Sequence, residues 1–285
     1  MTTRDIQLRS GRRVHLVEAG AGAPVLFLHG SNTSSRSLFP LLEHLRDVHA
    51  IAVDRPGFGL SDAAPVPRER FRAAAVEFVD EIAGALELDR PTLAGNSMGG
   101  TWALWYALAH PERVGRLVLL GSAPLLPATR APAPLRVLSA PIVGALLARV
   151  MKPDARMVVR LMGSMGEADT IVRYPDLIEA LVAAGRDPVA TAVNRAEIRA
   201  VLTPFGFRRS MLLSPDELRQ VLVPTLLIWG DADPVGDVAA ARTAAALIPD
   251  ARLELLPAGH VPYLGHPERA GELVTEFATS SPLRA

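Results

Sequence analysis

The segment GNSMG at residues 95–99 places a serine between glycines, after a short apolar run and before a helix-like apolar pattern. This is the G-x-S-x-G arrangement, in which a sharp turn from strand to helix projects a serine hydroxyl from the edge of a sheet. The glycines remove side chains that would collide at such a turn. Ser97 is therefore predicted to be a nucleophile rather than part of a structural glycine turn. The backbone N–H of Met98, at the start of the expected helix, is predicted to face an anion.

A serine hydroxyl needs a base, and the base needs a carboxylate that orients it. Among the seven histidines, His260 stands in a loop just after a late apolar run, in LLPAGHVPYL. The preceding apolar run ends in GDAD, which offers Asp231 and Asp233. We choose Asp233 because the residue three positions after Gly230 points back toward the histidine, and we expect Asp231 to satisfy local N–H groups of the turn. Ser97, Asp233 and His260 thus form the predicted triad.

The loop FLHGSNTSS at residues 27–35 follows another apolar run and is expected beside the serine turn. Acyl chemistry requires hydrogen-bond donors for a developing oxyanion. We expect the backbone N–H of Ser31 to be one donor and that of Met98 the other. The His29 ring is expected to pack and hydrogen-bond within this loop instead of acting as a base. The candidates for contact with the substrate are Asn32, Phe58, Val235 and Val261.

The glycines and proline of DRPGFGLSD at residues 54–62 favour a turn after a further apolar run. Asp54, Arg55 and Ser61 are expected to tie that turn together, while Phe58 is expected to reach the substrate pocket.

Continuous apolar runs precede each of these polar positions. They cover residues 24–30, 49–57, 91–97 and 116–124, and amphipathic stretches separate them. Such an alternation predicts an α/β fold with a mostly parallel sheet that is covered on both faces. Residues 5–20 instead read as two alternating strands joined at a turn, an antiparallel hairpin at the sheet edge. Polar residues at the carboxyl ends of parallel strands converge on one rim, where ligands bind.

The alternation stops between residues 125 and 222, where the chain is rich in proline and then helical in pattern. Apolar runs resume at residues 224–234 and 251–260. We predict one sheet domain built from residues 1–124 and 223–285, interrupted by a helical cap at residues 125–222. Methionines of the cap are expected in ordinary packing more often than in a pocket wall; they are Met151, Met157, Met162, Met165 and Met211.

The composition excludes several classes of function. Thirty basic residues balance thirty acidic ones, so no overall field attracts nucleic acid. The absence of cysteine removes thiolate nucleophiles and thiolate metal sites, and no cofactor or metal motif is present. The charged N-terminal residues do not resemble a secretory signal, and no apolar run is long enough to span a membrane. We expect a cytoplasmic protein with a small-molecule substrate, and the sequence does not fix its oligomeric state.

Taken together, these motifs resemble the α/β-hydrolase superfamily nearly from end to end. The resemblance is carried by LHG at residues 28–30, DRPGFGLSD, GNSMGG, GDAD and the GH of residues 259–260, all in family order. It implies an eight-stranded sheet with a helical cap after the sixth strand. Family members that use an aspartate nucleophile are disfavoured, because residue 97 is serine. The GNSMGG segment is similar to that of carbon–carbon bond hydrolases acting on meta-cleavage products, which usually have tryptophan where this chain has Val261.

The leading prediction is a serine hydrolase that cleaves small to medium, mostly apolar carboxylic esters through an acyl-enzyme. The alternative is hydrolysis of a carbon–carbon bond in diketone acids by the same residues. A third possibility, from another class, is a small-molecule receptor that keeps the fold without catalysis. Fold alone does not choose among them.

Overall fold

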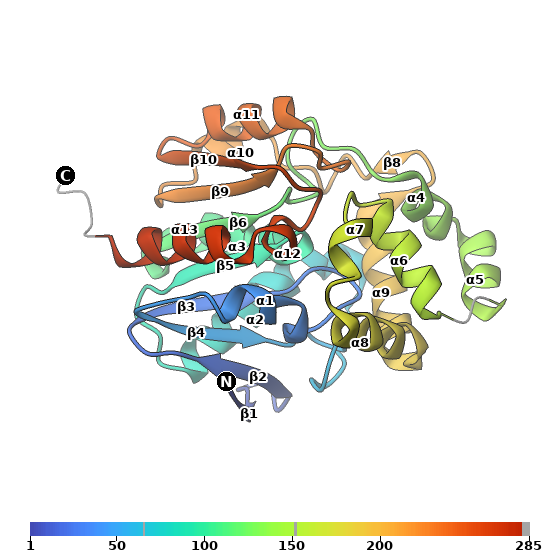
Figure 1. Ribbon diagram of the computed structural model, residues 1–285, viewed down its shortest axis with the longest axis horizontal. Coiled ribbons are helices and arrows are strands. Elements are labelled where there is room, and N and C mark those ends of the chain that lie inside the picture. The colour runs from blue at the N-terminus through green and yellow to red at the C-terminus, as the bar shows by residue number, and fades with distance from the viewer. Residues whose placement is uncertain (65, 151–152, 281–285) are drawn as a thin grey trace.

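The computed structural model describes residues 1–64, 66–150 and 153–280. Its centre is a sheet of eight strands in the order β1-β2-β4-β3-β5-β6-β9-β10 (Figure 1). The strands are β1 (Thr2–Gln7), β2 (Arg13–Ala19), β3 (Ala23–Leu28), β4 (Val48–Val53), β5 (Thr92–Asn96), β6 (Arg116–Leu120), β9 (Thr225–Gly230) and β10 (Ala251–Leu256). The eight-stranded α/β sheet is therefore confirmed.

The strands with an alternating sequence pattern are antiparallel, and the strands that are continuous apolar runs are parallel to one another. β1 pairs with β2 in antiparallel fashion, as the alternating N-terminal segment predicts, and β2 is also antiparallel to β4, which the sequence did not predict. The pairs from β4 through β3, β5, β6 and β9 to β10 are all parallel. All five residues of β5 are buried, which explains why this strand is a continuous apolar run and not an alternating one.

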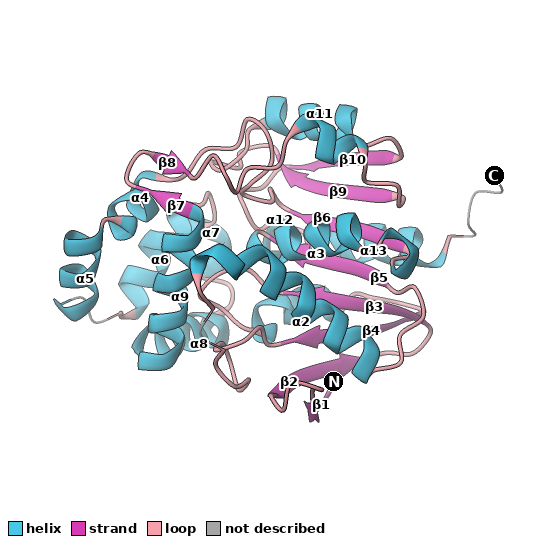
Figure 2. Ribbon diagram, turned by 180° about the vertical axis from the view of Figure 1, so that it is seen from behind, coloured by secondary structure: helices cyan, strands magenta, loops and turns pink. Residues whose placement is uncertain are grey.

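Helices cover both faces of the sheet. One face packs against α2 (Phe71–Ala85), α3 (Met98–Ala109) and α11 (Val238–Leu247), and the other against α1 (Phe39–Leu42), α12 (Pro262–Gly265) and α13 (Pro267–Thr279) (Figures 1 and 2). Each fully buried Leu, Ile or Phe side chain contributes about 1.5–3 kcal/mol to folding, so these two apolar layers hold the sheet rigid.

The chain between β6 and β9 is mainly helical and lies at one end of the sheet (Figure 1). Its helices are α4 (Ala133–Ser139), α5 (Pro141–Val150), α6 (Ala155–Gly163), α7 (Ala168–Ile171), α8 (Pro175–Arg186), α9 (Pro188–Val201) and α10 (Pro215–Arg219). The sequence did not predict the small antiparallel hairpin of β7 (Leu202–Thr203) and β8 (Gly206–Phe207). Strands of two residues are too short to show an alternating pattern.

The expected helical insertion after the sixth strand is thus present, and we call this part, from α4 to α10, the helical segment. Among the described residues, no helix has both the length and the apolar character needed to cross a bilayer.

Candidate active site

The backbone around Ser97 has the sharp turn that the sequence predicts. β5 ends at Asn96, α3 begins at Met98, and Ser97 between them has φ 53° and ψ −119°. A non-glycine residue in this region costs about 1–3 kcal/mol and persists only where its surroundings impose it. A Cβ atom on Gly99 would lie 2.1 Å from the Leu28 carbonyl oxygen, so the start of α3 can lie this close to β3 only without a side chain.

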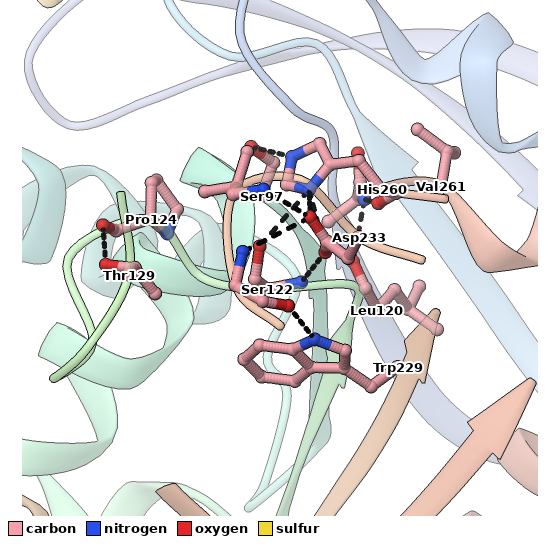
Figure 3. Close-up of polar contacts among 12 residues, drawn as sticks. Ser97, Leu120, Ser122, Pro124, Thr129, Trp229, Asp233, His260 and Val261 are labelled. Carbon is pink, nitrogen blue, oxygen red and sulfur yellow. Dashed lines mark hydrogen bonds and ion pairs between the residues drawn. The ribbon is translucent and has the colours of Figure 1, made fainter. Parts of the chain in front are cut away.

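Ser97 and His260 meet at the carboxyl ends of their strands. The Ser97 Oγ atom lies 2.9 Å from Nε2 of His260, whose Nδ1 lies 3.0 and 3.1 Å from the two carboxylate oxygens of Asp233 (Figure 3). An ionised carboxylate only accepts hydrogen bonds, so Nδ1 carries the ring proton and Nε2 is free to accept the serine proton. A hydroxyl in this arrangement can lose its proton to the ring as it attacks a carbonyl.

Asp233 is 3 % exposed, in the turn after β9. It accepts hydrogen bonds from the backbone N–H groups of Ser122, at 3.0 Å, and Val235, at 2.9 Å. Burial acts to raise the pKa of Asp233, but the charge and hydrogen bond of His260, together with these N–H groups, outweigh it and lower the pKa below its ordinary value of 3.8. The carboxyl is therefore held ionised beside the ring.

Ser122, in the loop after β6, was not predicted. Besides its backbone contact with Asp233, its Oγ atom lies 3.2 Å from Nδ1 of His260 (Figure 3). Its position directly after a buried parallel strand was the signal that could have identified it. Asp231, the other acid of this turn, is exposed and its backbone N–H bonds to Leu256.

The loop of His260 is held by the helical segment. The His260 N–H donates to the Met165 carbonyl at 2.8 Å, and the Val261 N–H donates to Oε1 of Glu167 at 2.9 Å. Glu167 is 1 % exposed, and burial raises its pKa above the ordinary value of 4.5 against the opposing effect of the Val261 N–H. Glu167 could not be singled out from the sequence, because this contact joins residues 94 positions apart.

The loop after β3 is shaped by His29, as expected. Its Nδ1–H donates to the Gly30 carbonyl at 2.7 Å, and its Nε2 accepts from the Arg55 N–H at 2.9 Å. Ser31 and Met98 line the same cavity as Ser97. Within the described ranges, neither backbone N–H donates a hydrogen bond to the protein. Their role as oxyanion donors stays a prediction.

Arg55 makes a contact that the sequence did not indicate. Asp54 and Ser61 tie their turn together, since the Ser61 hydroxyl donates to the Asp54 carbonyl at 2.8 Å. The Arg55 guanidinium instead extends to Glu197 of α9, with an Nη1 to Oε2 distance of 2.7 Å. Phe58 is buried against Arg55 and does not line the main cavity, contrary to expectation, because its ring packs under this guanidinium.

A cavity of about 590 Å³ opens onto Ser97 and His260. Asn32, Val235 and Val261 line it, as expected for substrate contacts. The helical segment supplies most of its apolar wall, including Leu135, Leu138, Met157, Val158, Leu161 and Met162.

Of the cap methionines, Met157, Met162 and Met165 line this cavity, so more of them face the cavity than we expected. Met211 packs against the apolar core, and Met151 lies outside the described residues. No group of three or more histidine, aspartate or glutamate side chains is placed to hold a metal ion in the part of the chain that the structure describes.

Comparisons with known proteins agree on one family. A sequence model of the alpha/beta hydrolase family matches residues 25–273. A 2-hydroxymuconate semialdehyde hydrolase of Pseudomonas putida is 30% identical, over 95% of this chain and 92% of the relative. A 2-hydroxy-6-oxononadienedioate/2-hydroxy-6-oxononatrienedioate hydrolase of Cupriavidus pinatubonensis is 29% identical, over 97% of this chain and 95% of the relative.

Among solved structures, an esterase from Rhodococcus sp. ECU1013 is similar in fold, with a TM-score of 0.71, 24% identity and coverage of 98% of this chain and 99% of that one. The matched family model extends over most of the chain, and the three similar proteins just described are two hydrolases and an esterase. The protein is therefore an enzyme of the alpha/beta hydrolase family.

Proposed function

We propose that this enzyme is a serine hydrolase that cleaves carboxylic esters through an acyl-enzyme. The observation that carries the proposal is the chain of contacts from Ser97 through His260 to Asp233 at the floor of a cavity. Ser97 attacks the ester carbonyl while His260 takes its proton and then gives it to the leaving alcohol. Asp233 holds the ring in the required tautomer. The N–H groups of Ser31 and Met98 bind the oxyanion.

The cavity supports small to medium, mostly apolar substrates. Its wall is dominated by aliphatic and methionine side chains, and its volume is about 590 Å³. Residues 125–222 act as a cap that shields the site from bulk solvent, admits the water that hydrolyses the acyl-enzyme with His260 as base, and sets the length of acyl chain that fits. The remainder of the chain, residues 1–124 and 223–285, forms the catalytic core.

Hydrolysis of 4-nitrophenyl esters from acetyl to decanoyl tests this proposal. The wild type is expected to release nitrophenol with a preference for one range of chain lengths, and Ser97→Ala is expected to lose this turnover. A well-folded wild type without turnover of any ester in the series would overturn the ester hydrolase.

Cleavage of a carbon–carbon bond in a diketone acid is the second candidate. Asn194 and Arg195 of α9 both line the cavity. The Oδ1 atom of Asn194 is buried without a hydrogen-bond partner, and the half-buried Arg195 side chain forms no ion pair with another described residue. A guanidinium that is free in a cavity is suited to a substrate carboxylate. The names of the two relatives, both hydrolases of such acids, favour the same candidate.

The test measures turnover of a 2-hydroxy-6-oxo-dienoate by the wild type and by Arg195→Leu. Turnover by the wild type, together with a raised KM in Arg195→Leu, would support this candidate over the ester hydrolase. Equal KM values in Arg195→Leu and the wild type would exclude a carboxylate site at Arg195.

A further inference from the structure

Three separate parts of the chain meet at the carboxylate of Glu197. Glu197 belongs to α9 of the helical segment and is 3 % exposed. Its Oε2 accepts from Nη1 of Arg55 at 2.7 Å, and its Oε1 accepts from the Ser31 hydroxyl and from Nη2 of Arg55. Arg55 follows β4 and Ser31 follows β3. One acid of the helical segment therefore contacts two neighbouring loops of the core.

Arg55 also hydrogen-bonds to the loop after β3. Its Nη2 donates to the Gly30 carbonyl at 2.8 Å, and its backbone N–H donates to Nε2 of His29 at 2.9 Å. The guanidinium carbon lies 5.2 Å from the ring centre of Phe58 and 4.7 Å from that of Trp102, so it has little freedom to move. The peptide that carries the Ser31 N–H is thus fixed on both sides, by the Gly30 carbonyl and by the Ser31 hydroxyl.

Stability alone gives little reason for this arrangement. A buried ion pair recovers about as much free energy as its desolvation costs, and apolar residues of the same size often stabilise a protein as well or better. The hydrogen bonds to Gly30 and Ser31, however, are ones that an apolar pair could not make. The contacts therefore favour a role in positioning this loop.

We propose that Glu197 is a positioning residue that holds the oxyanion loop, residues 29–31, through Arg55 and the Ser31 hydroxyl. The inference rests on the proposed function, because it takes the Ser31 N–H as an oxyanion donor. The contacts that dock α9 on the core would then also position the oxyanion loop. The oxyanion hole is therefore complete only when the helical segment is packed against the core.

The test compares kcat and KM of wild type, Glu197→Gln and Ser31→Ala on a matched pair of 4-nitrophenyl substrates, an ester and its thionoester. Sulfur accepts hydrogen bonds poorly, so the preference for the oxygen substrate reports the oxyanion donors. Ser31→Ala keeps the backbone N–H and removes one contact with Glu197. We expect kcat for the ester to fall about tenfold in Ser31→Ala and about 100-fold in Glu197→Gln.

KM is expected to stay within about threefold, because the loss belongs to the transition state. The preference for oxygen over sulfur should fall together with kcat. A general loosening of the fold would lower the rates of both substrates and leave this preference unchanged.

Because Glu197→Gln leaves a buried guanidinium without its partner, a second variant that is expected to keep the fold is measured beside it. The double variant Arg55→Met with Glu197→Leu replaces the pair by apolar groups and is expected to fold. It should show the same loss of kcat and of oxygen preference. Arg72→Gln is the control, since it removes a half-exposed ion pair between α2 and Glu217 of the helical segment and should keep the wild-type kcat.

Two other outcomes would overturn the inference. In the first, the wild type turns over the ester and the variants have the same kcat and the same oxygen preference as the wild type. This result would refute the role of Glu197 and leave the proposed function intact. A well-folded wild type that turns over neither substrate would refute the proposed function, and the role of Glu197 with it.

Discussion

The carboxylate of Asp233 accepts more hydrogen bonds than are needed to orient the His260 ring. Backbone N–H groups from two loops, those of Ser122 and Val235, converge on its carboxylate together with His260. These donors keep the pKa of Asp233 low although its burial acts to raise it. At the scale of single residues, the site is thus built to keep this acid ionised and the proton of His260 on Nδ1.

Replacing Asp233 by Asn tests that arrangement. The amide can donate to Nδ1, which moves the ring proton to Nε2 and leaves no acceptor for the Ser97 hydroxyl. In the well-studied serine proteases this change lowers kcat by about 10⁴, and we expect a loss of similar size for ester turnover here. Asp231→Asn, in the same turn but exposed, is the control and should keep wild-type turnover. A small loss in Asp233→Asn would contradict the assigned tautomer.

His29 gives a prediction for stability against pH. Burial and the nearby charge of Arg55 lower the pKa of His29 well below 6.5, so the folded protein holds this ring neutral. The unfolded chain takes up a proton as the pH falls below 6.5 and the folded one does not. The contribution to stability is therefore complete above that value and is lost as the pH falls, by up to about 1.4 kcal/mol per pH unit.

Urea unfolding of wild type and His29→Gln checks this prediction, because glutamine does not titrate. The free energy of unfolding of the wild type should fall relative to that of the variant between neutral pH and about pH 5. Parallel curves for the two proteins would show that His29 takes up its proton equally well in both states.

At the scale of elements, the site depends on how closely α3 lies against β3 and β5. A Cβ atom on Gly99 would meet the backbone of Leu28 and His29 at 2.1–2.6 Å. Gly84 on α2 is exposed and has no atom within 4 Å of such a Cβ position. The two glycines therefore differ in packing although both lie in helices.

Gly99→Ala is expected to destabilise the protein by about 1–3 kcal/mol or more, since backbone atoms must move apart. It should also lower ester turnover by displacing Met98 and Ser97. Gly84→Ala should stabilise the protein by about 0.5–1 kcal/mol and leave turnover unchanged, because alanine favours the helix. Thermal unfolding of both variants measures the difference. Equal stabilities would mean that α3 does not lie as close to β3 as described.

Local signals explain what the sequence could predict. Ser97, Asp233 and His260 each lie in a turn that follows its own apolar strand within a few residues, so each turn could be identified from its local sequence. Parallel strands then bring the three turns to the same edge of the sheet. The contact of Arg55 with Glu197 joins residues 142 positions apart, which no local pattern reveals. Phe58 was misplaced for this reason, because the guanidinium it packs against was expected to remain in its own turn.

Glu197 did carry one signal. It lies seven residues after Ala190 and four before Val201, both buried on α9, so a charged residue stands on an apolar helix stripe. Such a residue needs a partner when buried. This pattern could have indicated the need for a partner, but the sequence analysis did not single out Glu197, and only the structure identifies Arg55 and Ser31 as its partners.

At the scale of the whole molecule, the core and the helical segment enclose the cavity together. Val158 of α6 lines it and is 6 % exposed, whereas Val172, just after α7, is 53 % exposed and lies outside the lining. Val158→Phe should shorten the cavity and lower kcat/KM for decanoyl esters about tenfold or more relative to acetyl esters.

Val172→Phe makes the same change on the surface of the helical segment and should keep the wild-type preference for chain length. The ratio of kcat/KM across the ester series measures both variants. An unchanged ratio in Val158→Phe would mean that the acyl chain does not occupy the space beside α6.

The proposed function depends above all on Ser97 being an activated nucleophile, and covalent labelling measures this activation. Intact mass is measured after incubation of wild type and Ser97→Ala with a fluorophosphonate, which reacts with a serine whose proton has a base to receive it. We expect one adduct on the wild type and none on Ser97→Ala. A folded wild type that stays unlabelled, or a Ser97→Ala protein that is labelled equally well, would contradict it.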